Sequence, residues 1–294
     1  MGMRRALVMA FRIPAVCLVF AVSFIVGGML SGLSAVAQQG APPPPAGESF
    51  LLSFLVFSIS VGVAVSYLVL RSSWDGWRLV VTLCLSVYGV STAATQIETA
   101  WFLSSSLPRG TMQALFLQGA ITTALAIPLS VLLLGKWRSP SRISGRVEYE
   151  RPRTGPGAWT ILLLVVAFVF LYMLFGYYVA WQSPAVREFY GGRDYPGFIA
   201  SLRANWTDRP GLFALQVFRA LLYIACVYPL VRMLRASRWE TALAIALFLS
   251  VWSTALLLPN PLMPSAVAHA HLRETLGFGV VFGALAGALL WRRR

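Results

Sequence analysis

Charged residues are scarce in this 294-residue sequence: they make up 12% of it, against 58% hydrophobic residues. Several apolar runs are longer than the ~18 residues that mark a membrane-spanning helix. A soluble core of this size has no need of such runs. The scarcity of charge therefore excludes a soluble globular protein and predicts an integral membrane protein.

Cysteine is also rare, and familiar catalytic motifs are missing. Cys17, Cys84 and Cys226 lie far apart inside apolar runs, so they form neither a CxxC site nor a disulfide framework. The chain contains no HExxH, GxSxG or Walker sequence. These absences argue against a familiar hydrolase and against an ATP-driven machine. The sequence specifies no cofactor.

Eight apolar segments are long enough to cross a bilayer, which predicts an all-α fold, a polytopic transmembrane helical bundle. The predicted spans cover residues 13–37, 50–70, 79–103, 112–134, 158–181, 212–234, 239–258 and 265–291. A basic stretch rich in Ser, Pro and Gly, residues 135–157, separates spans 2–4 (50–134) from spans 5–8 (158–291). It is predicted to be a flexible inner loop between two four-span halves.

The first segment, residues 1–37, has two interpretations. Its basic start, its apolar run and Ala35-Val36-Ala37 resemble a cleaved signal peptide. The apolar run is about 20 residues long, however, and a signal's hydrophobic core has only ~7–15. We favour an uncleaved first span; cleavage leaves seven spans in the same orientation. The Pro-rich residues 38–49 are predicted to form an exposed outer linker with polyproline character.

The net charge of +14 invites a nucleic-acid partner, but the positions of the basic residues argue against one. Of 24 lysines and arginines, 17 fall on alternate loops and on the termini. This asymmetry is the positive-inside pattern. It predicts a multi-pass protein of the plasma (inner) membrane with both termini in the cytoplasm. The lipid bilayer is the predicted partner, and attraction to anionic headgroups is a secondary effect.

The last span carries a ladder of glycines. Gly279, Gly283 and Gly287 are four residues apart, so they share one face on which a neighbouring backbone can approach closely. We expect this face to contact a membrane-protein partner or a second copy of the chain.

Both histidines of the protein lie in the same span. His271 and Glu274 are three residues apart and share one side of the helix, which we expect to face protein. His269 points about 200° away from His271. The two histidines therefore cannot ligate one metal ion on a regular helix.

Polar residues from four spans fall in the outer third of the predicted bilayer. The candidate binding residues are Glu98, Gln118, Gln216, Arg219, His271 and Glu274. A charge in a span costs ~2.5–3.5 kcal/mol at the bilayer centre and less near the interface. Charges that persist there usually pair or line a wet cavity, and both alternatives stay open.

The first alternative is structural. Glu98 and Arg219 form a buried ion pair that pins span 3 to span 6, and Gln216 and Tyr223, on the same face as Arg219, complete its hydrogen bonds.

The second alternative is functional: a pocket open to the outside that binds a polar or anionic group, with Arg219 as the anchor. A third use of the cluster is a divalent-metal or proton site made by His271, Glu274 and Glu98. No ligand-spacing motif supports the metal.

The segment between spans 5 and 6, residues 182–211, is the largest soluble piece outside. Phe198, Leu202 and Trp206 recur at helical spacing, which predicts a short interfacial helix over residues 196–206. The segment is either a solvated loop or a lid over the pocket with Gly191 and Gly192 as its hinge.

Three functions follow from these alternatives. The sequence favours a small-solute or lipid-handling, transporter-like protein that uses the polar cluster. The alternatives are an intramembrane enzyme with a His/Glu acid–base or metal site, and a non-catalytic subunit or sensor of a membrane complex.

Overall fold

The computed structural model of the chain describes residues 3–33, 50–103, 107–137, 155–192, 194, 196–259 and 263–291, with side chains from Ala10 onward. The predicted cleavage motif, the linker 38–49 and most of the loop 135–157 lie outside these residues, so their predictions stay predictions.

The described residues form helices joined by short connections, which confirms the all-α prediction. The helices are α1 (Met3–Leu30), α3 (Phe50–Arg71), α4 (Gly76–Tyr88), η1 (Gly89–Ala93), α5 (Ala94–Leu103), α6 (Thr111–Leu133), α7 (Ala158–Phe175), η3 (Gly176–Ala180), α8 (Pro184–Phe189), α9 (Phe198–Asp208), α10 (Gly211–Met233), α11 (Arg238–Ser250), η4 (Val251–Leu257) and α12 (Ser265–Leu290). Here η1 and η3 are π-helices and η4 is a 3₁₀-helix.

In the described part of the chain, eight helical segments are long and apolar enough to cross a membrane. α4, η1 and α5 form one of them, as do α7 with η3 and α11 with η4. They match the predicted spans within a few residues, except that the first ends at Leu30. There Gly32, with a φ of 72°, turns the chain away from the helix.

Large apolar side chains cover the outside of the bundle. Leu18 on α1, Leu85 on α4 and Leu162 on α7 are each at least half exposed. A soluble monomer rarely shows extended apolar surface of this kind, whereas the hydrocarbon core of a bilayer accepts it. The surface and the helix lengths together fit an integral membrane protein.

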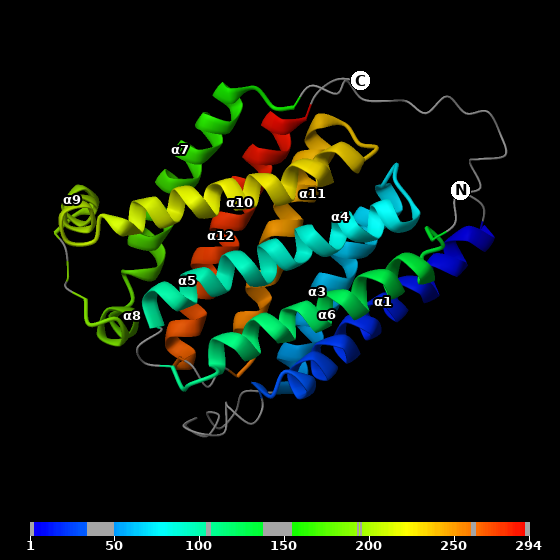
Figure 1. Ribbon diagram of the computed structural model, residues 1–294, viewed down its shortest axis with the longest axis horizontal. Helices are drawn as coiled ribbons and strands as arrows, with labels where there is room; N and C mark the ends of the chain where they lie inside the picture. Colours follow the sequence, from blue (N-terminus) through cyan, green and yellow to red (C-terminus); the bar gives the residue numbers. More distant parts are fainter. Residues whose placement is uncertain are drawn as a thin grey trace.

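The buried core is continuous across both groups of spans. Leu68 on α3, Leu83 on α4, Val227 on α10 and Phe248 on α11 belong to one cluster of buried apolar side chains. α3 lies against α11 and η4, and α4 lies against α10, as Figure 1 shows for the inclined α4 and α10. The two four-span groups are thus packed into one bundle.

The glycine ladder of α12 is covered by α11 of the same chain. A Cβ atom at Gly283 would lie 2.6 Å from Ala246 Cα, and one at Gly287 would lie 2.8 Å from Ala242 Cα. The close approach that the spacing predicted is confirmed, but the expectation of an external partner or second copy on this face is wrong. The ladder is used within the chain because α11 and α12 are sequential, antiparallel spans joined by a short connection.

α1 is packed into the bundle through small residues. A Cβ atom at Gly62 of α3 would lie 2.7 Å from Cys17 Cα, and one at Gly27 would lie 2.5 Å from Thr122 Oγ1 on α6. Thr122 Oγ1 also donates a hydrogen bond to Ser23 O at 3.3 Å. α1 is thus packed closely against α3 and α6, and its retention in the mature protein stays a prediction.

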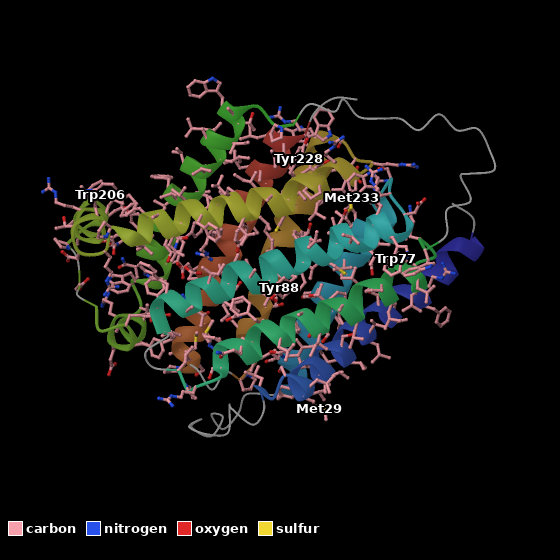
Figure 2. The ribbon with its side chains drawn as sticks, viewed as in Figure 1. Met29, Trp77, Tyr88, Trp206, Tyr228 and Met233 are labelled. Carbon is pink, nitrogen blue, oxygen red and sulfur yellow. The ribbon has the colours of Figure 1, made fainter. Side chains whose placement is uncertain are left out.

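The bundle has two ends, a basic end and a cavity end. The basic end is where α3, α6, α10 and α12 end and where α4, α7 and α11 begin; the cavity end is the opposite one. Trp77 and Met233 lie near the basic end in Figure 2, and Trp206 on α9 lies at the opposite end.

Short loops interlock at the basic end. Ser73 N donates to Met233 O at 2.6 Å, and Arg235 N donates to Arg71 O at 2.9 Å, which ties the α3–α4 turn to the α10–α11 turn. Lys136 Nζ donates to Ser72 O at 2.9 Å. Burial, and then the neighbouring Arg235, lower the pKa of Lys136.

Candidate functional site

A cavity of about 720 Å³ lies within the cavity end of the bundle. Its walls come from α1, α3, α6, α8, α9, α10 and α12 and from the three described spans that contain a π- or 3₁₀-segment. Most of the lining is apolar and aromatic, and its least exposed charged side chains come from α5, α10 and α12. Five of the six predicted residues line it: Glu98, Gln118, Arg219, His271 and Glu274.

Arg219 is the most enclosed charge of the site. It lies about two turns into α10, and only 5% of the residue is exposed. Its Nη2 lies 2.6 Å from Glu98 Oε2, its Nη1 donates to Gln216 Oε1 at 2.8 Å, and its Nε donates to the backbone carbonyl of Ala94 at 3.1 Å. The predicted ion pair between spans 3 and 6, and the role of Gln216, are confirmed.

Aromatic residues surround the same guanidinium. Its carbon lies 5.7 Å from the ring centre of Tyr172 and 6.0 Å from that of Phe168, both on α7. Tyr223, one turn along α10, lies beside Arg219, and Tyr172 lies beside Glu98. Glu98, Gln216 and the Ala94 carbonyl thus supply acceptors for three of the five guanidinium N–H groups. Breaking a buried pair of this kind by removing one partner typically costs ~3–5 kcal/mol. Arg219 is thus committed to the protein, which weakens its predicted role as an anchor for an anion.

His271 and Glu274 form a second polar group across the cavity. His271 Nδ1 lies 2.7 Å from Glu274 Oε2, and His271 Nε2 lies 3.2 Å from the Tyr190 hydroxyl. The shared face predicted for His271 and Glu274 is confirmed, and His269 is exposed on another face of α12. Burial, and then the charges of Glu274 and Glu98, raise the pKa of Tyr190 above its usual range. The hydroxyl therefore stays protonated at neutral pH.

The metal site suggested for His271, Glu274 and Glu98 is not assembled. Among the described residues, no group of three or more His, Cys, Asp and Glu side chains could hold a metal ion. The physical reason is that each carboxylate has its own partner: Glu98 is held by Arg219 and Glu274 by His271.

Gln118 and Gln216 occupy different places from those of the charged groups. Gln118 lies towards α1, where its Nε2 would be 3.4 Å from a Cβ atom at Gly28. Gln216 is fully buried behind Arg219, and the structure does not place it in the cavity wall. The six predicted residues are therefore one ion pair with its supporting amide, one His–Glu pair and one separate amide.

All three departures from α-helical geometry in the membrane spans lie along the cavity. Thr92 of η1, Tyr177 of η3 and Ser253 of η4 line it. Short π-segments occur often at functional sites, and a seven-residue 3₁₀ run is unusually long. Spans 3, 5 and 7 thus lose regular geometry where they border the cavity.

The segment between spans 5 and 6 covers part of the cavity. It contains α8 and the interfacial helix α9, which begins at Phe198, two residues later than predicted (Figure 1). Tyr190, Ser201 and Leu202 belong to the cavity wall. Gly191 has a φ of 60°, and a Cβ atom at Gly192 would lie 2.1 Å from Trp181. The observed local geometry thus favours glycine at both positions, and the predicted hinge stays a prediction.

Tyr172 and Trp252 are among the cavity residues that the sequence pattern did not single out. Tyr172 was hidden in a strongly apolar run, although a single hydroxyl there is a signal in itself. Trp252 of η4 also lines the cavity, and within the described part of the chain its buried Nε1 has no hydrogen-bond partner. This is unusual, since a buried N–H normally has an acceptor.

No protein family, curated protein or solved structure matches this chain.

Proposed function

We propose that this protein binds a small amphipathic molecule in the cavity and moves it across or within the bilayer, as a transporter-like protein. The observation that carries the proposal is that one cavity joins two environments. Phe20, Phe24 and Phe57 line the part next to α1 and α3, and charged side chains on α5, α10 and α12 line the other. A largely apolar chamber of ~300–1,000 Å³ with a few convergent polar groups is typical of small-molecule sites.

The positive-inside pattern supports a finer proposal about orientation. The basic end faces the cytoplasm of the cell that carries this plasma-membrane protein, and the cavity end faces outward. A C-terminal alkaline phosphatase fusion should be inactive and a C-terminal green fluorescent protein fusion bright. An active phosphatase fusion overturns this orientation.

Native mass spectrometry of the purified protein tests the binding proposal. Leu256 of η4 lines the cavity, so Leu256→Trp should fill part of it. Leu243→Trp, on the same span at a residue that is 70% exposed, is the matched control. Wild type and control should carry a bound small molecule or lipid that Leu256→Trp lacks. Equal bound mass in all three proteins contradicts the proposal.

One observation favours an intramembrane enzyme as the second candidate. The imidazole of His271 lines the cavity and is held by Glu274 and Tyr190, as an acid–base group needs to be. Incubating the co-purified molecule with wild type and with His271→Gln tests this candidate. Conversion by wild type alone supports an enzyme. Flux through the reconstituted protein without conversion supports the transporter. If neither conversion nor flux is observed, the remaining function is a non-catalytic subunit or sensor.

A further inference from the structure

We propose that the ligand is a hydrophobic organic cation, such as a quaternary ammonium or phosphonium compound or a protonated lipophilic amine, with Glu274 as its counter-ion. This inference rests on the proposed function and names the ligand class of the same cavity.

The charge balance of the cavity wall carries the argument. Glu98 is neutralised by Arg219, whose guanidinium is also bonded to Gln216 and to a backbone carbonyl. Among the described residues, a ligand anion therefore meets no buried guanidinium without partners in the cavity wall. In the described part of the cavity wall, the remaining buried charge is Glu274, whose one ion-pair partner is His271 when that ring is protonated.

Glu274 presents one oxygen towards the cavity. Its Oε2 is bonded to His271, and among the described contacts its Oε1 accepts no protein hydrogen bond. Oε1 faces Gly176 of η3, where a Cβ atom would lie 3.4 Å away, and Gly176 also lines the cavity. Because Gly176 has no side chain, no Cβ atom covers this oxygen on that side. A carboxylate that is 9% exposed in a largely apolar chamber attracts a cation more strongly than one in water does.

The other charged and titratable groups around Glu274 do not reverse this balance. Tyr172 and Tyr190 are neutral donors, and Glu98 adds negative charge that Arg219 balances. Arg209 also borders the cavity, at the end of α9, but it is exposed and beside Asp208. Arg273 is exposed on another face of α12. Water and salt screen exposed charges of this kind.

The aromatic wall adds a second attraction for a cation. Tyr172, Phe175, Tyr177, Trp181 and Trp252 all line the cavity. The face of an aromatic ring attracts a desolvated cation, and such cages suit quaternary cations. The same rings bind the apolar body of the ligand, and the volume of about 720 Å³ accepts a molecule with several rings.

Two probes of nearly the same shape and opposite charge test the inference. Tetraphenylphosphonium and tetraphenylborate are titrated into the full-length protein in a non-ionic detergent by calorimetry, with micelle blanks. The phosphonium should bind, and Glu274→Gln should weaken it about tenfold or more. Glu188→Gln, an exposed acid on α8 outside the cavity wall, should change its affinity less than about twofold.

A pH series on wild type keeps the test valid where Glu274→Gln does not fold. Phosphonium affinity should fall as the pH is lowered from about 8 to about 5, because protonated His271 neutralises Glu274. His271→Gln should remove this response. Tighter binding of the borate, no phosphonium binding, or a pH response that survives His271→Gln overturns the inference. The two proposals can fail separately. If Leu256→Trp loses the co-purified ligand but wild type does not bind the phosphonium, the cation inference is overturned and the proposed function stands.

Discussion

Each end of the bundle holds an ion pair between two spans, and the two pairs are built in opposite ways. At the basic end, Arg71 of α3 pairs with Glu240 of α11; their side chains are 43% and 34% exposed. Tyr67 also donates to Glu240 at 2.8 Å. At the cavity end, the Arg219 side chain is 6% exposed and that of Glu98 is 25% exposed. Exposed pairs are worth ~0–1 kcal/mol, whereas breaking a buried pair is costly.

The surroundings of the two pairs differ in the same way. Backbone hydrogen bonds between turns already fix the basic end, so its ion pair is an addition to a rigid frame. At the cavity end the spans leave regular α-geometry and enclose a chamber instead of packing against one another. Buried polar groups are thus kept where packing is incomplete, which is the pattern expected of a binding site rather than of a structural clasp alone.

The largest effect is expected from breaking the buried pair. Arg219→Gln leaves Glu98 without its partner, so thermal unfolding in detergent should show a loss of stability of ~3–5 kcal/mol. Glu98→Gln combined with Arg219→Gln should cost less than Arg219→Gln alone, since no buried charge is left unpaired. If the stability loss of the double variant equals the sum of the losses of the two single variants, Glu98 and Arg219 do not interact as a pair.

Gly287 and Gly197 give a matched test of packing at the two ends. Gly287→Ala near the basic end places a Cβ atom 2.8 Å from Ala242 Cα, so the α11–α12 contact must open. The expected loss is ~1–3 kcal/mol. Gly197→Ala at the cavity end meets nothing within 4 Å and should stay within ~0.5 kcal/mol. Equal melting temperatures for the two variants contradict the expected difference in packing between Gly287 and Gly197.

Alkaline pH should affect the two ends with opposite sign. The lowered pKa of Lys136 means that the folded state loses this proton first, so its contribution to stability rises with pH up to the ordinary lysine value of ~10.4. The raised pKa of Tyr190 means that the unfolded state loses this proton first, so its contribution falls above ~10. Stability is measured by thermal unfolding at a series of pH values. Lys136→Met should remove the rise in stability with pH, and Tyr190→Phe should remove the fall. Unchanged slopes contradict the assignments.

The smallest effect is expected from the exposed pair. Glu240→Gln keeps an acceptor for Tyr67 and should lower stability by no more than ~1 kcal/mol, because water screens the partners. A melting temperature as low as that of Arg219→Gln indicates that the basic end depends on its charges after all.

Much of the candidate site followed from position along the helices. The depths of Glu98 and Arg219 predicted their pairing, and the three-residue spacing of His271 and Glu274 predicted their contact. The partners that come from other helices could not be read in this way. Tyr172, Tyr190 and Trp252 approach the cluster only because α7, the α8 segment and η4 fold over it. The assignment of Arg219 to internal partners, rather than to a ligand, also depends on those contacts.

The sequence by itself determined the class of protein, the number of spans and the depth of each buried polar residue. Runs of apolar residues and the rise of an α-helix decide these locally. Only the tertiary structure decided that the glycine ladder serves α11, that Glu98 does not join His271 and Glu274 in a metal site, and that three spans leave α-geometry around a cavity. These features depend on which helix faces which, and side-chain packing between distant segments sets that choice.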